Sequence, residues 1–588
     1  MRNFSVRLMS IASTVLFLSA CGGNIESSNT SELKKTSISL ATFGFDDGEK
    51  KDDTSAPLPN LEAQKSASRF LAQASFGGNL DDIYTVAMLG NANWLDEQLF
   101  KPQVLHRTYL DGVATTLPAG TKLQQRDFLD AFWKQAATGD DKVRQRVTFA
   151  LSEIFVVSFQ NSNLPFYTRG VASYYDMLGQ HAFGNFRNLL EGVARHPMMG
   201  IYLSSMGNKK ENANSVPDEN FARELMQLFT IGLYQLNQDG SLKMNGNNPI
   251  ETYKHEDVAG LSKALTGWSW AGPDQTENRF KGHTQDANRD WQPMQNYTAF
   301  HSTSEKSFLG KTISGGTTGE ADLKVALDTL FNHPNVGPFI GKQLIQRLVT
   351  SNPSPAYISR VAAAFANNGQ GVRGDMKALI RAVLLDPEAQ NPNFNPQNPS
   401  RKIREPIARM AHWMRAFGAK SKSGRFTIGN IDDPMTGIGQ SPLRSPTVFN
   451  FQRPGYVPPN TSIANAGLTA PEMQNTGEIS VAGYLNYMMD VIPNGAGTGS
   501  GVRDVQANYA TEIALATEPA QLIDRIDLLL LNGTMSSTLR NQILTAVNSV
   551  TIPLPTSSNA TQIAAAKTNR VHLAIFLSMA SPEYIVQK

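Results

Sequence analysis

Helical periodicity runs through almost the whole chain and constrains its fold more than any other feature. Apolar residues recur at spacings of three and four, while the alternating pattern that indicates strands is scarce. Residues 126–157 predict two helices separated by a polar break, and residues 322–369 predict three helices with prolines at their joints. We therefore predict a mostly α-helical protein, a large multi-helix body with long irregular loop regions and little or no β-sheet.

Two regions depart from this pattern and are expected to form long loops. Residues 269–320 are rich in glycine, asparagine and aromatic side chains, and residues 421–510 are rich in glycine, proline and asparagine. In a compact helical protein such loops are often binding or lid segments, or else poorly ordered. We assign residues 61–588 to one helical body that carries these two irregular insertions.

The N-terminus has the form of a bacterial export signal. Residues 1–20 contain a short basic start followed by an apolar run of about 13 residues that ends in small side chains. A permanent membrane helix needs a longer run, of about 20 residues. The sequence LSAC at 18–21 matches the lipobox pattern, in which the cysteine receives acyl chains. We expect residues 1–20 to be a lipoprotein signal peptide and Cys21 to be the lipidation site.

The segment after the signal predicts a tether. Residues 21–60 are polar, charged and rich in serine and threonine, so they bury too little apolar surface to fold and are expected to be disordered. Gly22 stands where an aspartate would direct retention in the inner membrane, which favours the outer membrane. Cys21 is the only cysteine, so the mature chain forms no internal disulfide and offers no thiolate nucleophile or zinc ligand. We expect an exported protein that its N-terminal lipid holds in the cell envelope.

Charge and motifs exclude several classes of function. Once residues 1–20 are removed, 51 basic side chains face 51 acidic ones, and no clustered basic face suggests nucleic-acid binding. The chain contains no HExxH, GxSxG, P-loop or GxGxxG motif. No two histidines have the i, i+4 spacing of a helical metal site. We therefore assign no metal site, and no motif identifies a cofactor.

Several segments in a fixed order carry a resemblance to a known family. They read ASRFLAQASFGG, HPMMGIYL, ENFARELMQLFTIG, DVAGLSKALTGW, FHSTSEKSFLG, RSPTVFNFQRPGY, APEMQ and MASPEYIVQK. Together they resemble the bacterial family called domain of unknown function 1800 over residues 66–588. The resemblance implies export but no established activity. It also implies a partner, because genes of the family often neighbour those of a second exported family that resembles sulfatases and alkaline phosphatases.

One acid within the segment 218–232 is a candidate functional residue. On a helical projection Glu224 falls among Leu225, Leu228 and Ile231, in the apolar arc, where an unpaired carboxylate is costly. It is therefore paired, protonated or a ligand. We favour a buried structural pair with an arginine or histidine from a distant segment, so that replacing Glu224 by glutamine lowers stability. A catalytic acid is the alternative.

The loop region 269–320 and its approach carry the other candidates. Trp270, Trp291 and Tyr297 lie among amides and acids, a composition typical of sugar-binding surfaces and also of loops that aromatic side chains pin to the body. Trp270 follows a glycine and is expected to stand free. His283 and His301 lie in the same region and are candidate catalytic partners for an acid.

Two arginines complete the candidate list. Arg444 and Arg453 lie in a proline-rich segment that favours an extended backbone, and either is a candidate partner for Glu224 or a binder of an anionic ligand.

Two functional classes stay open. The first is a surface module that binds a glycan or the co-encoded exported partner. The second is an extracytoplasmic hydrolase that acts on an extracellular polymer through Glu224 with His283 or His301.

Overall fold

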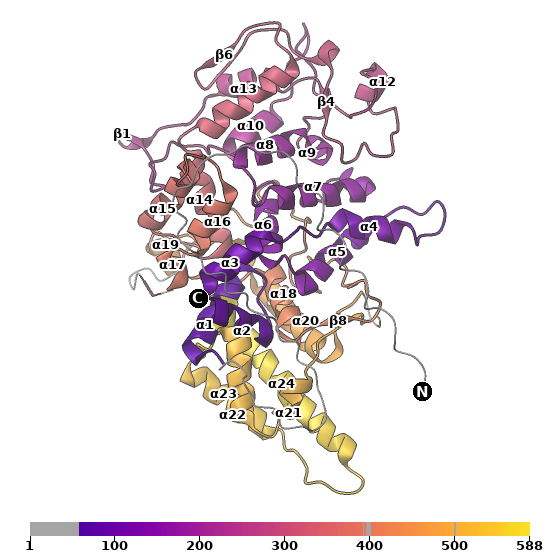
Figure 1. Cartoon of the computed structure of the whole chain (residues 1–588), viewed down its shortest axis with the longest axis vertical. Helices are drawn as coiled ribbons and strands as arrows, with labels where there is room; N and C mark the ends of the chain where they lie inside the picture. The colour runs from indigo at the N-terminus through magenta and orange to yellow at the C-terminus, as the bar shows by residue number, and fades with distance from the viewer. Residues whose placement is uncertain (1–57, 392, 395–400, 499–500, 502) are drawn as a thin grey trace, which may run out of the picture. The chain divides into compact units, whose positions relative to one another are not determined.

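The computed structural model describes residues 58–588 apart from 392, 395–400, 499–500 and 502 (Figure 1). Within this part of the chain helices predominate, and strands occur only as five antiparallel pairs. The predicted mostly α-helical class is therefore confirmed. The predicted signal peptide, Cys21 and nearly all of the tether lie outside the described residues.

Helices fill the chain from its first described residues to its end. The first group comprises α1 (Leu61–Ala74), α2 (Leu80–Leu89), α3 (Asn91–Phe100), α4 (His106–Ala114), α5 (Gln125–Thr138), α6 (Lys142–Ser152), η1 (Leu164–Tyr167), α7 (Thr168–His181), α8 (Phe186–Arg195), α9 (Pro197–Tyr202) and α10 (Asn220–Gln227). The second comprises α11 (His255–Ala264), α12 (Glu277–Phe280), η2 (Thr298–Phe300), α13 (Gly319–Asn332), α14 (Val336–Leu348), α15 (Pro355–Ala366), α16 (Met376–Leu384), α17 (Pro387–Gln390) and α18 (Pro406–Ala416). The third comprises α19 (Ser462–Asn465), η3 (Pro471–Asn475), α20 (Glu478–Asn494), α21 (Ala510–Ala514), α22 (Pro519–Ile526), the π-helix η4 (Asp527–Leu531), α23 (Ser537–Ser549), α24 (Ala560–Ala580) and α25 (Pro582–Ile585).

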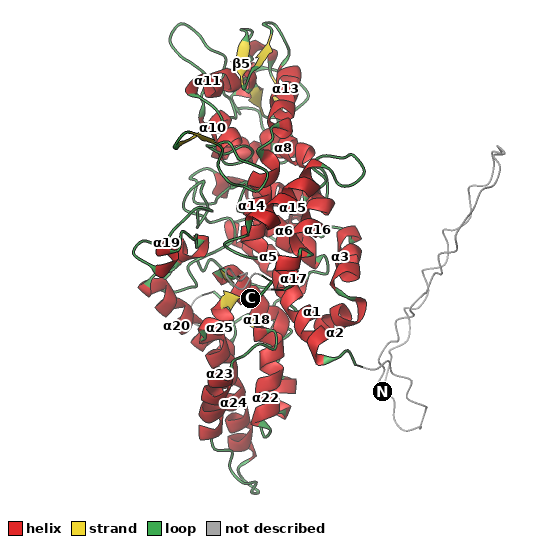
Figure 2. Cartoon of the chain, turned by 90° about the vertical axis from the view of Figure 1, so that its left-hand side faces the viewer, coloured by secondary structure: helices red, strands yellow, loops and turns green. Residues whose placement is uncertain are grey.

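The strand pairs are short and connect loops (Figure 2). They are β1 (Met244–Asn245) with β2 (Asn248–Pro249), β3 (Trp268–Ser269) with β4 (Gln295–Asn296), β5 (Lys306–Phe308) with β6 (Lys311–Ile313), β8 (Lys420–Ser421) with β9 (Val505–Gln506), and β7 (Lys402–Ile403) with β10 (Val586–Gln587). In the last pair Val586 lies opposite Ile403, so the end of the chain is joined to the segment that leads into α18.

One continuous hydrophobic cluster extends from α1 to α25. Helix α7 packs against α4, α5, α6 and α8. Its Tyr175 meets Phe128 and Phe132 of α5 edge-on, with ring centroids 5.7 and 6.1 Å apart, an arrangement that aromatic rings favour. No helix among the described residues combines the length and the apolar character that crossing a bilayer requires.

The three helices predicted within 322–369 are confirmed as α13, α14 and α15. Thr318 caps α13 by accepting a hydrogen bond from the backbone N–H of Ala321, and Ser354 caps α15 in the same way ahead of Pro355. The predicted loop region at 421–510 is irregular only in part, because α20 lies within it. Apolar side chains surround that helix, Ile479 exposed and Met488 buried, which hides the helical pattern in the sequence.

Candidate ligand-binding cavity

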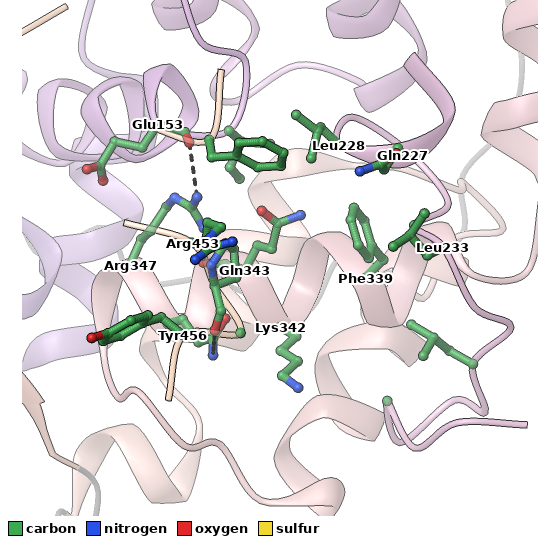
Figure 3. Close-up of a pocket in the computed structure, with 18 of the residues that line it drawn as sticks. Glu153, Gln227, Leu228, Leu233, Phe339, Lys342, Gln343, Arg347, Arg453 and Tyr456 are labelled. Atoms are coloured by element: carbon green, nitrogen blue, oxygen red, sulfur yellow. Dashed lines mark hydrogen bonds between the residues drawn. The ribbon is translucent and has the colours of Figure 1, made fainter. Parts of the chain in front are cut away.

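A cavity of about 950 Å³, here called the main cavity, lies between α14 and two loops (Figure 3). Helix α14 forms one wall, residues 232–242 form the second, and residues 448–459 form the third. The volume lies within the range of about 300–1,000 Å³ that is usual for small-ligand sites.

Helix α14 presents a polar stripe to this cavity. Lys342, Gln343, Gln346 and Arg347 all line it, next to the apolar Phe339. Their spacings of three and four residues place them on one face of the helix. The stripe interrupts a helix that is otherwise apolar and buried.

The second wall is apolar and is held by a buried asparagine. The amide nitrogen of Asn335 donates to the backbone oxygens of Ile231 and Tyr234, each at 2.8 Å, and its oxygen accepts from the N–H of Leu236 at 2.9 Å. These three bonds fix the turn that carries Leu233 into the cavity wall. Figure 3 shows Leu228, Leu233 and Phe339 together on this side.

The third wall carries Arg453 and Tyr456. The backbone N–H of Arg453 donates to the side-chain oxygen of Gln474 at 2.9 Å, and the amide nitrogen of Gln346 donates to the carbonyl oxygen of Pro454 at 3.1 Å. These contacts tie the loop to α14 and η3. The exposed guanidinium of Arg453 is left free to meet a ligand, since no hydrogen bond or ion pair joins it to another described residue.

Positive charge dominates the lining. Lys342, Arg347 and Arg453 are its cations, and Glu153, at the end of α6, is its one acid. Lys342 has no ion-pair or hydrogen-bond partner among the described residues, and burial lowers its pKa. The carboxyl group of Glu153 points away from the other lining residues in Figure 3, while its backbone oxygen accepts a bond from Arg347 at 3.0 Å.

A buried group of charges, here called the Glu153 cluster, lies next to the cavity. Its members are Arg146, Glu153, Arg347, Lys402 and Glu405, all of them buried. The backbone oxygen of Arg347 accepts from both Lys402, at 2.7 Å, and Arg146, at 2.5 Å. Nε of Arg347 and Nη1 of Arg146 find no hydrogen-bond partner among the described groups. The cluster thus holds donors in excess of its internal bonds.

The two acids of this cluster share a hydrogen bond and differ in ionisation. Burial raises the pKa of Glu153 well above its usual value, and the neighbouring negative charge of Glu405 raises it further. Burial would also raise the pKa of Glu405, but attraction by Lys402 and the hydrogen bond from Glu153 outweigh it and lower that pKa. Glu153 therefore holds the proton of the pair and Glu405 is the carboxylate.

The chain matches one family model, described as a protein of unknown function (DUF1800), over residues 69–586. It is a DUF1800 protein. No curated protein and no solved structure matches the chain significantly. The main cavity lies wholly within the part of this DUF1800 protein that the family model covers.

The predicted pairing of Glu224 is wrong. In this DUF1800 protein Glu224 is buried in α10, 9% exposed, as its place in the apolar arc predicts. Its side chain forms no ion pair or hydrogen bond within the described chain, and its Oε2 is one of the unpartnered buried atoms. Burial raises its pKa, and the opposing charge of the adjacent Arg223 lowers it less. A buried acid can thus be accommodated by holding its proton instead of by pairing.

The two candidate histidines lie in different surroundings. His283 is exposed just after α12. His301 is buried, with its Nε2 at 2.9 Å from Oδ2 of Asp322 and its Nδ1 at 2.9 Å from the backbone oxygen of Thr266. Both ring nitrogens of His301 are therefore occupied. Neither histidine nor Glu224 lines the main cavity.

Asp322 gathers a second buried charge group, here called the Asp322 cluster. Besides His301, its Oδ2 meets Nζ of Lys306 at 2.7 Å, and its Oδ1 accepts from the hydroxyl of Thr317 at 2.5 Å. Burial would raise the pKa of Asp322, but the hydrogen bonds from His301, Lys306 and Thr317 outweigh it and lower that pKa. None of these residues lines the main cavity.

The aromatic candidates belong mainly to the core. Trp270, expected to stand free, is 5% exposed, because Tyr167 packs on it and the guanidinium of Arg289 lies 4.3 Å from its ring centroid. Tyr297 is 1% exposed and donates its hydroxyl hydrogen to the backbone oxygen of Trp270. Of the three, only Trp291 is half-buried and lines a cavity, a second one between α7 and α8.

The two arginine candidates also lie in different surroundings. Arg444 forms an ion pair with Asp432 at 2.8 Å, whereas Arg453 lines the main cavity. Neither contacts Glu224, so their proposed role as its partner is wrong. The signal of the main cavity in the sequence is the set of polar residues at 342, 343, 346 and 347, spaced along one face of an apolar helix.

Proposed function

We propose that this DUF1800 protein is an exported lipoprotein, anchored through Cys21, whose body binds an anionic glycan in the main cavity. The N-terminal signal and lipobox support export and anchoring. The outer membrane is the proposed destination, with the tether carrying the body away from its surface.

The observation that carries the binding proposal is the uncompensated positive charge of the cavity. Lys342 and Arg453 have no carboxylate partner within the described chain, and the only acid in the lining holds its proton and turns away. An arginine fork and a lysine together suit carboxylate or sulfate groups. The apolar wall around Leu233 and Phe339 suits the carbon-bearing faces of sugar rings, so an acidic polysaccharide meets both surfaces.

A macromolecular partner fits the same proposal. We propose that the sulfatase-like or phosphatase-like exported protein encoded beside members of the family acts on the polymer that this cavity holds. Such an enzyme removes charged ester groups, and a binding module that selects charged chains would supply its substrate.

The hydrolase alternative has less support. It would use Glu224 with His283 or His301, and these side chains share no hydrogen bond, ion pair or cavity among the described residues. Both ring nitrogens of His301 already contact other groups, the backbone oxygen of Thr266 and the carboxylate of Asp322. A general acid or base must reach the reacting group, and none of the three faces the main cavity.

A binding titration tests the glycan proposal. We expect the detergent-solubilised protein to bind dextran sulfate and not neutral dextran, since the two polymers differ only in charge. Replacing both Lys342 and Arg453 by glutamine is expected to weaken binding at least tenfold, measured by isothermal titration calorimetry. Arg444→Gln removes one charge outside the cavity and serves as the control. Equal affinity for both polymers, or equal binding by the double variant, would refute the proposal.

Lipid anchoring has its own test. A hydroxyl cannot accept the diacylglyceryl group that a thiol accepts, so Cys21→Ser is expected to abolish lipid modification. Metabolic labelling with a fatty-acid analogue measures this directly. Equal labelling of the wild type and the variant contradicts the anchor and leaves the glycan proposal untouched.

A further inference from the structure

A second cavity, of about 500 Å³, lies between α7 and α8. Residues of α4 and of the loop after α12 complete its wall, and it shares no lining residue with the main cavity. Three side chains from three segments give it a distinct chemistry: His196, Arg107 and Trp291.

His196 supplies a buried hydrogen-bond donor. The residue is 5% exposed, and its Nδ1 accepts a hydrogen bond from the backbone N–H of Met198 at 3.2 Å, which caps α9. Burial lowers the pKa of His196 to about 3, so the ring is neutral and its one hydrogen is on Nε2. Nε2 has no partner among the described groups. A buried donor without an acceptor is unfavourable, and a ligand oxygen that reaches Nε2 would remove this cost.

Arg107 supplies the charge. Its guanidinium lies 4.8 Å from the ring centroid of Trp291 and forms no ion pair with a described residue. Two acids and a second arginine also line the wall. The carboxylate of Asp176 accepts from the backbone N–H groups of His106 and Arg107, and Glu191 pairs with Arg187 at 3.0 Å and with Arg195 at 3.5 Å. Arg107 is therefore the lining cation whose guanidinium has no ion-pair partner among the described residues.

Trp291 supplies a flat surface. The half-buried indole also meets the guanidinium of Arg169, whose carbon lies 4.1 Å from the ring centroid. Arg169 does not line the cavity and pairs with Asp111. The two arginines fix the orientation of the indole, and cation–π contact on an aromatic ring favours such an arrangement.

We propose that this cavity binds a single acidic sugar unit, whose carboxylate or sulfate pairs with Arg107, whose oxygen accepts the hydrogen of His196 Nε2, and whose ring lies against Trp291. The volume suits one small ligand and not a long polymer segment. The site shares no lining residue with the main cavity, so this proposal is tested independently of the proposed polymer binding.

The test uses the full chain in detergent and three monosaccharides as probes: glucuronate, glucose 6-sulfate and glucose. Calorimetric titration is expected to show saturable binding of at least one acidic probe and none of glucose. A preference for glucuronate or for glucose 6-sulfate identifies the acid group as carboxylate or sulfate. Absence of saturable binding by either acidic sugar, or equal binding of glucose, overturns the proposal.

Three variants locate the binding. Arg107→Gln is expected to weaken binding of the acidic probe at least tenfold, and His196→Asn at least fivefold, since asparagine keeps the helix cap but does not reach the position of Nε2. Arg444→Gln removes an arginine that lines neither cavity, so its affinity is expected to stay within twofold of wild type. The double variant of Lys342 and Arg453 also keeps its affinity for the monosaccharide, which separates this site from the main cavity. Unchanged affinity in Arg107→Gln overturns the proposal, and because Arg107 is partly exposed, that variant is expected to fold even where His196→Asn does not.

Discussion

The Asp322 cluster and the Glu153 cluster are both buried charge groups, yet only the Glu153 cluster contributes residues to the wall of the main cavity. In the Asp322 cluster both carboxylate oxygens have partners, supplied by His301, Lys306 and Thr317. In the Glu153 cluster two buried donors, Nη1 of Arg146 and Nε of Arg347, have none, and Arg347 belongs at once to the cluster and to the cavity wall. A buried carboxylate whose two oxygens both have partners indicates a structural role, whereas unused donors beside a cavity indicate a place where a ligand is expected.

The largest expected effect comes from breaking the buried ion pair of the Asp322 cluster. Asp322→Asn leaves the buried ammonium of Lys306 without its counter-ion, and breaking a buried pair costs about 3–5 kcal/mol. We expect a corresponding fall in the free energy of unfolding, measured by chemical denaturation. Asp328→Asn is the matched control, because this acid lies on the same helix in half-exposed ion pairs worth at most about 1 kcal/mol. Equal losses in the two variants would show that burial of the Asp322 cluster has no energetic consequence.

The two acids of the Glu153 cluster are expected to respond unequally to the same substitution. Glu405→Gln removes a carboxylate from Lys402, which keeps Glu472 at 3.5 Å as a second acid, so we expect a loss of about 2–3 kcal/mol. Glu153→Gln replaces a protonated acid by a neutral amide of similar shape and is expected to change the free energy of unfolding by less than about 1 kcal/mol. Denaturation of the two variants at pH 7 measures the difference. The opposite ranking would assign the proton to Glu405.

The pH dependence of stability sharpens this assignment. Below a pH of about 4, Glu153 is protonated in both the folded and the unfolded chain. Above it the unfolded chain releases the proton while the folded chain keeps it, because the pKa of Glu153 is raised, so stability from this group falls as pH rises, by at most about 1.4 kcal/mol per pH unit. Glu153→Gln is expected to remove this slope between pH 5 and 7, measured by thermal unfolding. The exposed Glu478, changed in the same way, should leave the slope unaltered.

The pH dependence that Asp322 gives to the stability has the opposite sign to that of Glu153. Its lowered pKa means that its stabilisation is present above the unfolded value of about 4 and is lost as pH falls through the folded value. Asp322→Asn therefore flattens the acid limb of the stability profile and leaves the range from pH 5 to 7 as in the wild type. A variant that altered the neutral range instead would contradict the contrast between the two clusters.

The smallest expected effect concerns Glu224, a buried acid that belongs to neither cluster. Its side chain has no hydrogen bond or ion pair within the described chain that a substitution would remove, and burial favours its neutral form. Glu224→Gln is therefore expected to change the free energy of unfolding by less than about 0.5 kcal/mol, the range of substitutions that break no specific interaction. A melting curve beside the wild type measures this. A loss of several kcal/mol would reveal a partner for Glu224 in solution.

Local features of the sequence were sufficient for much of the fold. The apolar spacing in 322–369, with prolines at the joints, predicts α13 to α15, because a helix depends on residues three and four positions apart. The burial of Glu224 was also predictable, since its position within the apolar arc fixes the face on which it lies. Its lack of a partner was not, because the partner would have come from another segment.

The order of the shared segments determined the family, and composition with periodicity determined the helical class, since both are properties of the chain read in one dimension. Tertiary structure alone decided the sites. Arg146, Arg347 and Glu405 meet although more than 50 positions separate each from the next along the chain, and Trp270 is covered by Tyr167 from a distant helix. Pairing and exposure of this kind depend on which helix faces pack together, and packing is set by the whole core, not by any local stretch of sequence.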